Sequence, residues 1–87
     1  MAKKVIKFYA TWCGPCKIYG KTWDKVTAEH ADAAEYINVD IDKDTTGLAV
    51  EYKIDTVPTT VVVKEDGSTV VEEGRLPKEV LTELILS

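Results

Sequence analysis

Two cysteines three positions apart, Cys13 and Cys16, are the residues of this sequence best suited to chemistry. They stand in the segment TWCGPCK, with Gly14 and Pro15 between them and Trp12 in front. Thiolates at this spacing can bind a metal ion, form a structural disulfide, or exchange electrons with another disulfide. The elements that hold the cysteines and the composition of the chain decide among these three chemistries.

The composition is that of one soluble globular domain, which we expect to span residues 1–87. Hydrophobic residues make up 45% of the chain and charged residues 30%. The net charge of −4 provides no basic stripe to neutralise phosphates, so we expect no nucleic-acid partner. The apolar runs are too short to span a membrane. We see no signal peptide in MAKKVIKFYATW and expect a cytoplasmic protein, in whose reducing compartment a permanent structural disulfide is disfavoured.

Four segments rich in β-branched and aromatic residues predict strands. Strands joined by helices should be parallel with right-handed crossovers, whereas the last two strands should form an antiparallel hairpin around Asp66-Gly67. The expected strands are residues 5–10, 35–39, 59–64 and 68–72.

Three segments predict helices. Tyr19, Trp23 and Val26 recur at helical spacing between about residues 15 and 30. Asp44 is expected to cap a short helix that reaches residue 52, and Pro77 to take the first position of a closing helix. The apolar face of the closing helix is expected to consist of Val80, Leu81, Leu84 and Ile85. The predicted fold is therefore a single α/β domain of order β-α-β-α-β-β-α, with a mixed four-stranded sheet and helices on both faces.

This order of elements places Cys13 where the first helix begins and Cys16 one turn inside it. Backbone N–H groups and the helix dipole at an N-terminus stabilise a thiolate on Cys13. One helical turn brings the two Cα atoms within the roughly 4.4–6.8 Å that a disulfide tolerates. We expect Cys16 to be the less exposed sulfur, so the pair suits an attacking thiol and a resolving thiol.

The segment from Trp12 to Lys17, WCGPCK, resembles the active-site segment of the thioredoxin family. Val57-Pro58-Thr59 resembles the second hallmark of that family, a cis-proline before the central strand, and we expect the Val57–Pro58 bond to be cis. Gly67 and Gly74 also fall where the family has glycines. The resemblance covers residues 5–87 and is closest to a minimal, glutaredoxin-sized thioredoxin that lacks the usual N-terminal strand and helix.

The resemblance implies a thioredoxin-like fold and thiol–disulfide exchange, with no cofactor besides a redox-active Cys13–Cys16 disulfide. Cys13 would attack a substrate disulfide and Cys16 would resolve the mixed disulfide. Pro58 would pack against the cysteines, and the backbone of Val57 would pair with the substrate like a β-strand. The implied partners are disulfide-containing proteins and a thioredoxin reductase or equivalent electron donor, and we expect a monomer. The implied supporting and substrate-binding residues are Trp12, Gly14, Pro15, Val57, Pro58, Thr59 and Gly74.

Two further positions of the implied site depart from the family pattern. Lys7 replaces a buried aspartate six residues before the first cysteine, and Tyr36 stands at the position of the lysine that partners this aspartate. Alternation along a strand groups Lys7 with Val5 and Tyr9. If that face lies under the active-site helix, we expect Lys7 to stabilise a thiolate; if its side chain extends to water, we expect little effect.

Metal binding is the main alternative for the cysteines. A closed zinc site needs four ligands, and the chain offers two Cys and one His. Asp40, Asp42, Asp44 and Glu51 follow the spacing of an EF-hand loop, but Thr45 occupies the position that requires glycine. We therefore expect no metal, and we interpret this acidic segment as a solvated loop.

Two alternative functions remain open. A glutaredoxin-like protein would use glutathione, but Gly14-Pro15 favours a thioredoxin, because glutaredoxins usually carry Pro followed by an aromatic residue there. A binding subunit with a thioredoxin fold would not need its thiols, and the presence of both cysteines argues against it.

Overall fold

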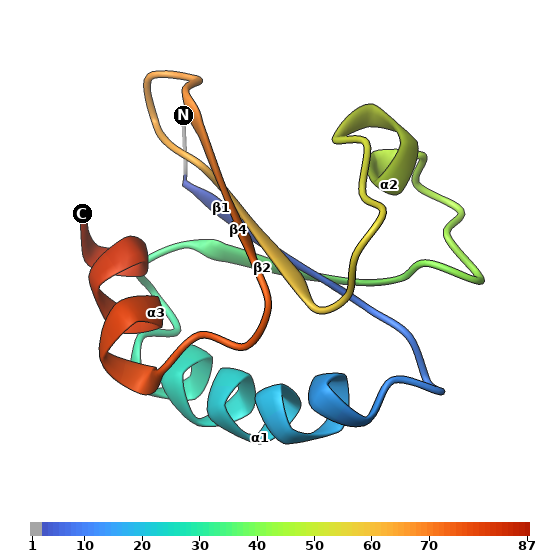
Figure 1. Cartoon of the computed structure of the whole chain (residues 1–87). Helices are drawn as coiled ribbons and strands as arrows, with labels where there is room; N and C mark the ends of the chain where they lie inside the picture. Colours follow the sequence, from blue (N-terminus) through green and yellow to red (C-terminus); the bar gives the residue numbers. More distant parts are fainter. Residues whose placement is uncertain (1–2) are drawn as a thin grey trace.

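The computed structural model describes residues 3–87, in which a four-stranded sheet carries helices on both faces (Figure 1). The element order is the expected one, and each strand boundary lies within one residue of its prediction. The strands are β1 (Lys4–Tyr9), β2 (Glu35–Asp40), β3 (Thr59–Val63) and β4 (Thr69–Glu73), and the helices are α1 (Gly14–Glu29), α2 (Leu48–Glu51) and α3 (Lys78–Leu86).

The strands lie side by side in the order β2-β1-β3-β4. β1 pairs parallel with β2 and antiparallel with β3, and β3 pairs antiparallel with β4. The mixed sheet expected from the sequence is thereby confirmed. In the β3–β4 hairpin, Gly67 has a φ of 88° and its N–H donates to the carbonyl of Lys64 at 2.9 Å. Glycine suits this turn because a side chain disfavours a positive φ.

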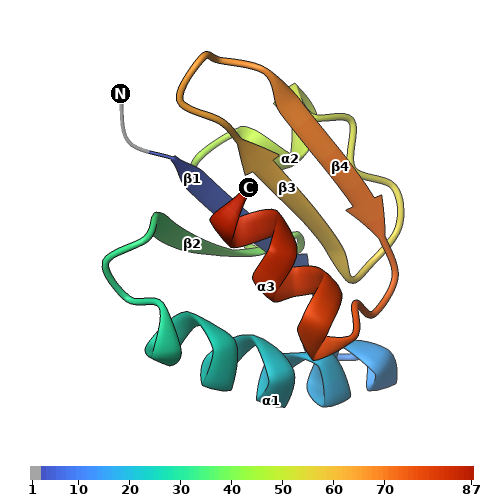
Figure 2. The same ribbon diagram turned by 90° about the vertical axis from the view of Figure 1, so that its left-hand side faces the viewer.

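The central strand β1 separates two hydrophobic cores, because successive side chains point to opposite faces of the sheet. Figure 2 shows α3 in front of the sheet, α1 below it and α2 behind it. Val5 packs toward α1 and α3 with Tyr19, Trp23, Val26, Val62, Leu76, Leu81 and Ile85. Ile6 and Phe8 pack toward α2 with Val39 and Val61. Both faces of β1 are therefore buried, as expected for a strand covered on both sides.

The helix α2 begins later than the sequence suggests. Its N-cap is Gly47, with a φ of 79°, and not Asp44 as predicted. The carboxylate of Asp44 instead accepts the backbone N–H of Thr46 at 2.7 Å and that of Ala49 at 3.0 Å. Asp44 therefore still satisfies one free N–H of the first helical turn, but from the preceding loop.

The closing helix α3 also differs from its prediction at two positions. Pro77 is the N-cap with extended backbone angles (φ −59°, ψ 152°), so the helix begins one residue later than predicted. Leu81 and Ile85 are buried against the sheet, whereas Val80 is 40% exposed. The predicted apolar face was therefore one residue too wide.

Lys3 connects the start of β1 to the end of α3. Its side chain is buried, and its Nζ donates to the carbonyl of Ile85 at 2.6 Å and also to the carbonyl of Ser87. The last carbonyls of a helix lack partners within the helix and carry partial negative charge, so a lysine there both satisfies and stabilises them.

Candidate active site

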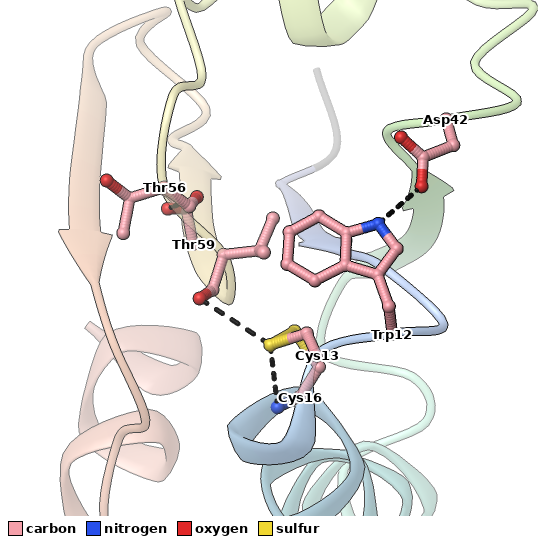
Figure 3. Close-up of a disulfide and its surroundings, with 7 residues drawn as sticks. Trp12, Cys13, Cys16, Asp42, Thr56 and Thr59 are labelled. Atoms are coloured by element: carbon pink, nitrogen blue, oxygen red, sulfur yellow. Dashed lines mark hydrogen bonds between the residues drawn. A yellow bond between two sulfur atoms is a disulfide. The ribbon is translucent and has the colours of Figure 1, made fainter.

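The two cysteines lie at the N-terminus of α1, directly after β1. Cys13 is the N-cap residue, with φ −91° and ψ 111°, and its Sγ accepts the N–H of Cys16 at 3.2 Å. The Cα atoms are 5.2 Å apart and the sulfurs form a disulfide (Figure 3). The helix pattern of the sequence predicted this placement. A thiolate on Cys13 would keep the same backbone donor and would lie at the positive end of the helix dipole.

The expected difference in exposure between the cysteines is absent from this disulfide-bonded structure. Each cysteine is 5% exposed. Cys16 also lines a hollow of about 240 Å³ together with Tyr9 and Ala10, on the side where β1 leads into α1. As whole residues the two cysteines are therefore equally shielded, and a less exposed sulfur on Cys16 stays a prediction.

The loop before β3 faces the disulfide from the other side. The Val57–Pro58 peptide bond is cis, and the carbonyl oxygen of Val57 lies 3.7 Å from Sγ of Cys13. The carbonyl of Pro58 accepts the N–H of Gly74 at 2.8 Å, at the end of β4. The structure thus brings together Cys13, Val57, Pro58 and Gly74 from three distant parts of the sequence.

Thr59 does not contribute its side chain to this surface. It is 2% exposed, and its Oγ1 donates to the carbonyl of Thr56 at 2.6 Å. The side chain therefore closes the turn that contains Val57 and Pro58 and is not available to a substrate. The structure does not support the substrate-binding role predicted for Thr59.

Trp12 forms an exposed rim of the site, where Gly14 and Pro15 are exposed as well. Its indole Nε1 donates to Oδ2 of Asp42 at 2.7 Å (Figure 3). The sequence pattern indicated a solvated loop or a metal ligand at Asp42 and did not reveal this contact. The parallel pairing of Tyr9 with Asp40 could have indicated it, since residues that follow two neighbouring parallel strands meet at one edge of the sheet.

Lys7 lies beneath α1, on the face of β1 that it shares with Val5. Its Nζ is 5.2 Å from the ring centre of Tyr9 and 5.5 Å from that of Trp23. A Cβ placed on Gly20, one turn beyond the second cysteine, would lie 3.8 Å from this Nζ. Burial lowers the pKa of Lys7, and attraction to Asp24 opposes this shift in part. The lysine is therefore a largely buried cation, bordered by aromatic rings that favour a positive charge.

Tyr36 lies away from the disulfide. Its hydroxyl donates to the carbonyl of His30 at 2.7 Å, and its ring packs edge-on against Trp23 with 5.9 Å between centres. Tyr36 pairs with Val5, four residues before the end of β1 at Tyr9, which corresponds to about 13 Å along a strand. Tyr36 thus supports the far end of α1, and the active-site role predicted for it is not supported.

The acidic segment after β2 forms hydrogen bonds within the protein. The carboxylate of Asp42 accepts the indole N–H of Trp12. Hydrogen bonds from the hydroxyl and N–H of Thr46 hold the pKa of Asp44 below its usual value. Within residues 3–87, no group of three or more His, Cys, Asp or Glu side chains is placed to hold a metal ion. No helix in the same range is long and apolar enough to cross a membrane.

The sequence is similar to those of known thioredoxins. The family model described as Thioredoxin matches residues 1–87. A mitochondrial thioredoxin of Mus musculus is 45% identical over 60 residues, which are 69% of this chain and 36% of the relative. The alignment thus spans only about a third of that relative's length. A thioredoxin of Mycoplasmoides gallisepticum is 35% identical over 83 residues, which cover 95% of this chain and 81% of the relative.

The structure is also similar to solved structures of thioredoxins. The structure of Fasciola hepatica thioredoxin has a TM-score of 0.81 at 30% identity and covers 97% of this chain and 78% of its own. Chloroplastic thioredoxin z has a TM-score of 0.80 at 28% identity, with 97% of this chain and 75% of its own covered. The expected fold class is confirmed by these similarities and by the topology of the sheet.

Proposed function

Because this chain belongs to the thioredoxin family, we propose that it is a thiol–disulfide oxidoreductase that reduces disulfide bonds in other proteins. One observation carries the proposal: the Cys13–Cys16 disulfide lies at the N-terminus of a helix, 3.7 Å from the Val57 carbonyl that precedes a cis-proline. The redox centre is the cysteine pair itself, so the reaction needs no further cofactor.

In the first step the thiolate of Cys13 attacks one sulfur of a substrate disulfide. An S–S bond forms between Cys13 and the substrate, and the second substrate sulfur leaves as a thiolate that takes up a proton from solvent. The N–H of Cys16 and the dipole of α1 favour the attacking thiolate. Cys13 is therefore the proposed nucleophile.

In the second step Cys16 loses its proton and attacks Sγ of Cys13. The Cys13–Cys16 disulfide forms, and the remaining substrate sulfur leaves as a thiolate. Two electrons have then passed from the protein dithiol to the substrate. The 5.2 Å between the Cα atoms allows this closure without movement of the backbone.

The substrate is proposed to bind across Trp12, Gly14, Val57, Pro58 and Gly74. Val57 is half-buried beside the disulfide and follows the exposed residues Asp55 and Thr56, so its backbone is suited to pair with an extended substrate segment. Pro15 and Gly14 leave the start of α1 open to a large partner. These features favour folded or unfolded protein chains as substrates over a small molecule held in a closed cavity.

We further propose that a thioredoxin reductase or an equivalent donor restores the dithiol, and that the protein acts as a cytoplasmic monomer. Cytoplasm supplies such donors and keeps thiols reduced. A glutathione-dependent, glutaredoxin-like cycle is the alternative that the same disulfide chemistry allows.

Reduction of insulin tests the proposal. The protein is assayed with NADPH and a thioredoxin reductase, and separately with glutathione and glutathione reductase, with Cys13→Ser as the inactive control. We expect turnover with the thioredoxin reductase and little with glutathione. Turnover with glutathione alone would favour the glutaredoxin-like cycle, and no turnover by the wild type in either system would contradict the proposed activity.

A further inference from the structure

A second hollow, of about 290 Å³, lies between α1 and the segment that joins β4 to α3. Its floor contains the buried side chains of Tyr19 and Leu76, and Ile18 at its edge is 55% exposed. The remaining lining residues are Thr22, Arg75 and Pro77. Pockets for whole small molecules measure about 300–1,000 Å³, so this hollow lies at the lower end of that range and has room for a side chain of a docked protein. We call it the Arg75 hollow.

The Arg75 hollow adjoins the redox site through the backbone. Arg75 follows Gly74, whose N–H bonds to the carbonyl of Pro58. On the other side, Ile18 and Tyr19 follow the second cysteine on α1. An extended chain advances about 3.3 Å per residue, so a substrate segment running from Val57 past Gly74 comes within reach of Arg75 after about two or three residues.

The charge of Arg75 is available to a ligand. Arg75 is the one arginine in the sequence, and its side chain is exposed. Within residues 3–87, the side chain of Arg75 forms no hydrogen bond and no ion pair. The nearby Lys78, by contrast, pairs with Glu29 at 3.7 Å. A guanidinium presents paired N–H donors that match a carboxylate.

Because the protein is acidic overall, the electrostatic attraction exerted by Arg75 acts only at short range. The chain carries a net charge of −4, so it does not attract acidic partners over long distances. Salt screens exposed charges beyond roughly 10 Å, and the effect of Arg75 is therefore confined to groups that dock beside it. Such a residue selects among substrate segments that already sit at the disulfide.

We propose that the Arg75 hollow is a subsite for an acidic side chain of the substrate, located two or three residues from the substrate cysteine. The carboxylate pairs with Arg75, and the aliphatic part of the side chain contacts Ile18 and Leu76. The inference rests on the proposed function, because the substrate must first place its disulfide at Cys13. It adds a preference for substrates with Glu or Asp near the reactive cysteine.

Matched peptide disulfides test the preference. Each peptide has one cysteine, linked by a disulfide to the same small thiol, and carries either Glu or Gln at two or three residues before or after this cysteine. Pre-reduced protein is mixed with each peptide at low salt, and the second-order rate of peptide thiol release is measured by chromatography. The measured quantity is the Glu-to-Gln rate ratio at each position.

The variants are Arg75→Gln, Arg75→Lys and Lys64→Gln. Lys64 lies at the opposite end of β3, so its variant makes the same change of charge away from the hollow. At the best position we expect the ratio of wild type to exceed that of Arg75→Gln by about two- to fivefold, the size of an exposed ion pair. Arg75→Lys should keep part of the difference, Lys64→Gln should keep all of it, and 0.5 M salt should remove most of it.

Each outcome decides the inference. Equal ratios for wild type and Arg75→Gln at every position would overturn it, as would an equal loss in Lys64→Gln. The Gln peptides report separately on the activity itself. If they are reduced, the proposed function stands whatever the ratios show; if no peptide is reduced, the proposed function fails and the subsite fails with it.

Discussion

The indole of Trp12 is fixed by the carboxylate of Asp42, although thirty residues separate them in the sequence. Trp12 is 68% exposed, so few other contacts determine where its ring lies. Asp42 is itself held, because its N–H donates to Oδ1 of Asp40 at 3.0 Å. A short loop after β2 thus orients the residue that forms the rim beside the disulfide.

Asp42→Ala should lower the rate of protein disulfide reduction by about two- to fivefold, because the indole loses its acceptor and samples other rotamers. The free energy of unfolding should change by less than about 0.5 kcal/mol, as is usual at an exposed position. Insulin reduction and urea unfolding measure the two quantities. Asp42→Asn retains a carbonyl acceptor and should keep most of the activity; a loss as large as that of Asp42→Ala would count against this role.

Cys16→Ser should accumulate mixed disulfides with substrate proteins, because Cys13 can still attack and nothing resolves the product. Cys13→Ser should accumulate few or none. Both variants are incubated with a lysate, and the disulfide-linked complexes are compared on non-reducing gels. Equal trapping by the two variants would refute the ordered roles of the cysteines.

Lys7→Met should raise the pKa of the attacking thiol, because it removes a positive charge buried beneath α1, beside Gly20 one turn beyond Cys16. Loss of thiolate stabilisation should also make the variant more reducing. Thiol pKa values come from the pH dependence of alkylation, and the potential from equilibration with glutathione. Lys21→Met, which removes an exposed lysine from the same helix, is the control. A shift below about 0.3 pKa unit, or roughly 0.4 kcal/mol, would mean that Lys7 does not act on the thiols.

Lys3→Met should reduce the free energy of unfolding by about 1–3 kcal/mol, since the variant leaves the carbonyl of Ile85 without its buried donor. Lys4→Met is a close control, because Lys4 is exposed and its replacement should change stability by no more than about 0.5 kcal/mol. Urea unfolding followed by tryptophan fluorescence measures both. Equal effects of the two substitutions would show that the contacts of Lys3 with α3 contribute little.

Alkaline pH should destabilise the fold through Tyr19. Burial raises the pKa of Tyr19 to about 12, and its hydrogen bond with Thr60 opposes this shift in part. The pKa of Tyr19 in the unfolded chain is about 10. At pH values between the two pKa values, the folded state binds more protons than the unfolded state, so the free energy of unfolding falls as pH rises, by up to about 3 kcal/mol. The Tyr19→Phe variant has no hydroxyl to ionise at this position, so its free energy of unfolding should depend less on pH between pH 9 and 11.5. The same slope in both proteins would contradict this account.

The order of the elements and the placement of the cysteines could be predicted from local sequence patterns. Helical spacing of Tyr19, Trp23 and Val26 located α1, and its start fixed Cys13 as the N-cap and Cys16 one turn beyond. Alternation along β1 also predicted that Lys7 shares a face with Val5, although it left open which helix covers that face. These features depend on residues within one or two turns of each other, where local geometry leaves few choices.

Local patterns could not predict which distant residues meet at the disulfide, because these contacts depend on how the strands align. Strand register brings Asp42 to Trp12, and the hairpin brings Gly74 to Pro58. The same packing turns the side chain of Thr59 into the interior and leaves Tyr36 at the far end of α1. Each of these outcomes depends on how β1, β2, β3 and β4 align within one sheet, and this alignment is set by cooperative packing of residues far apart in the chain.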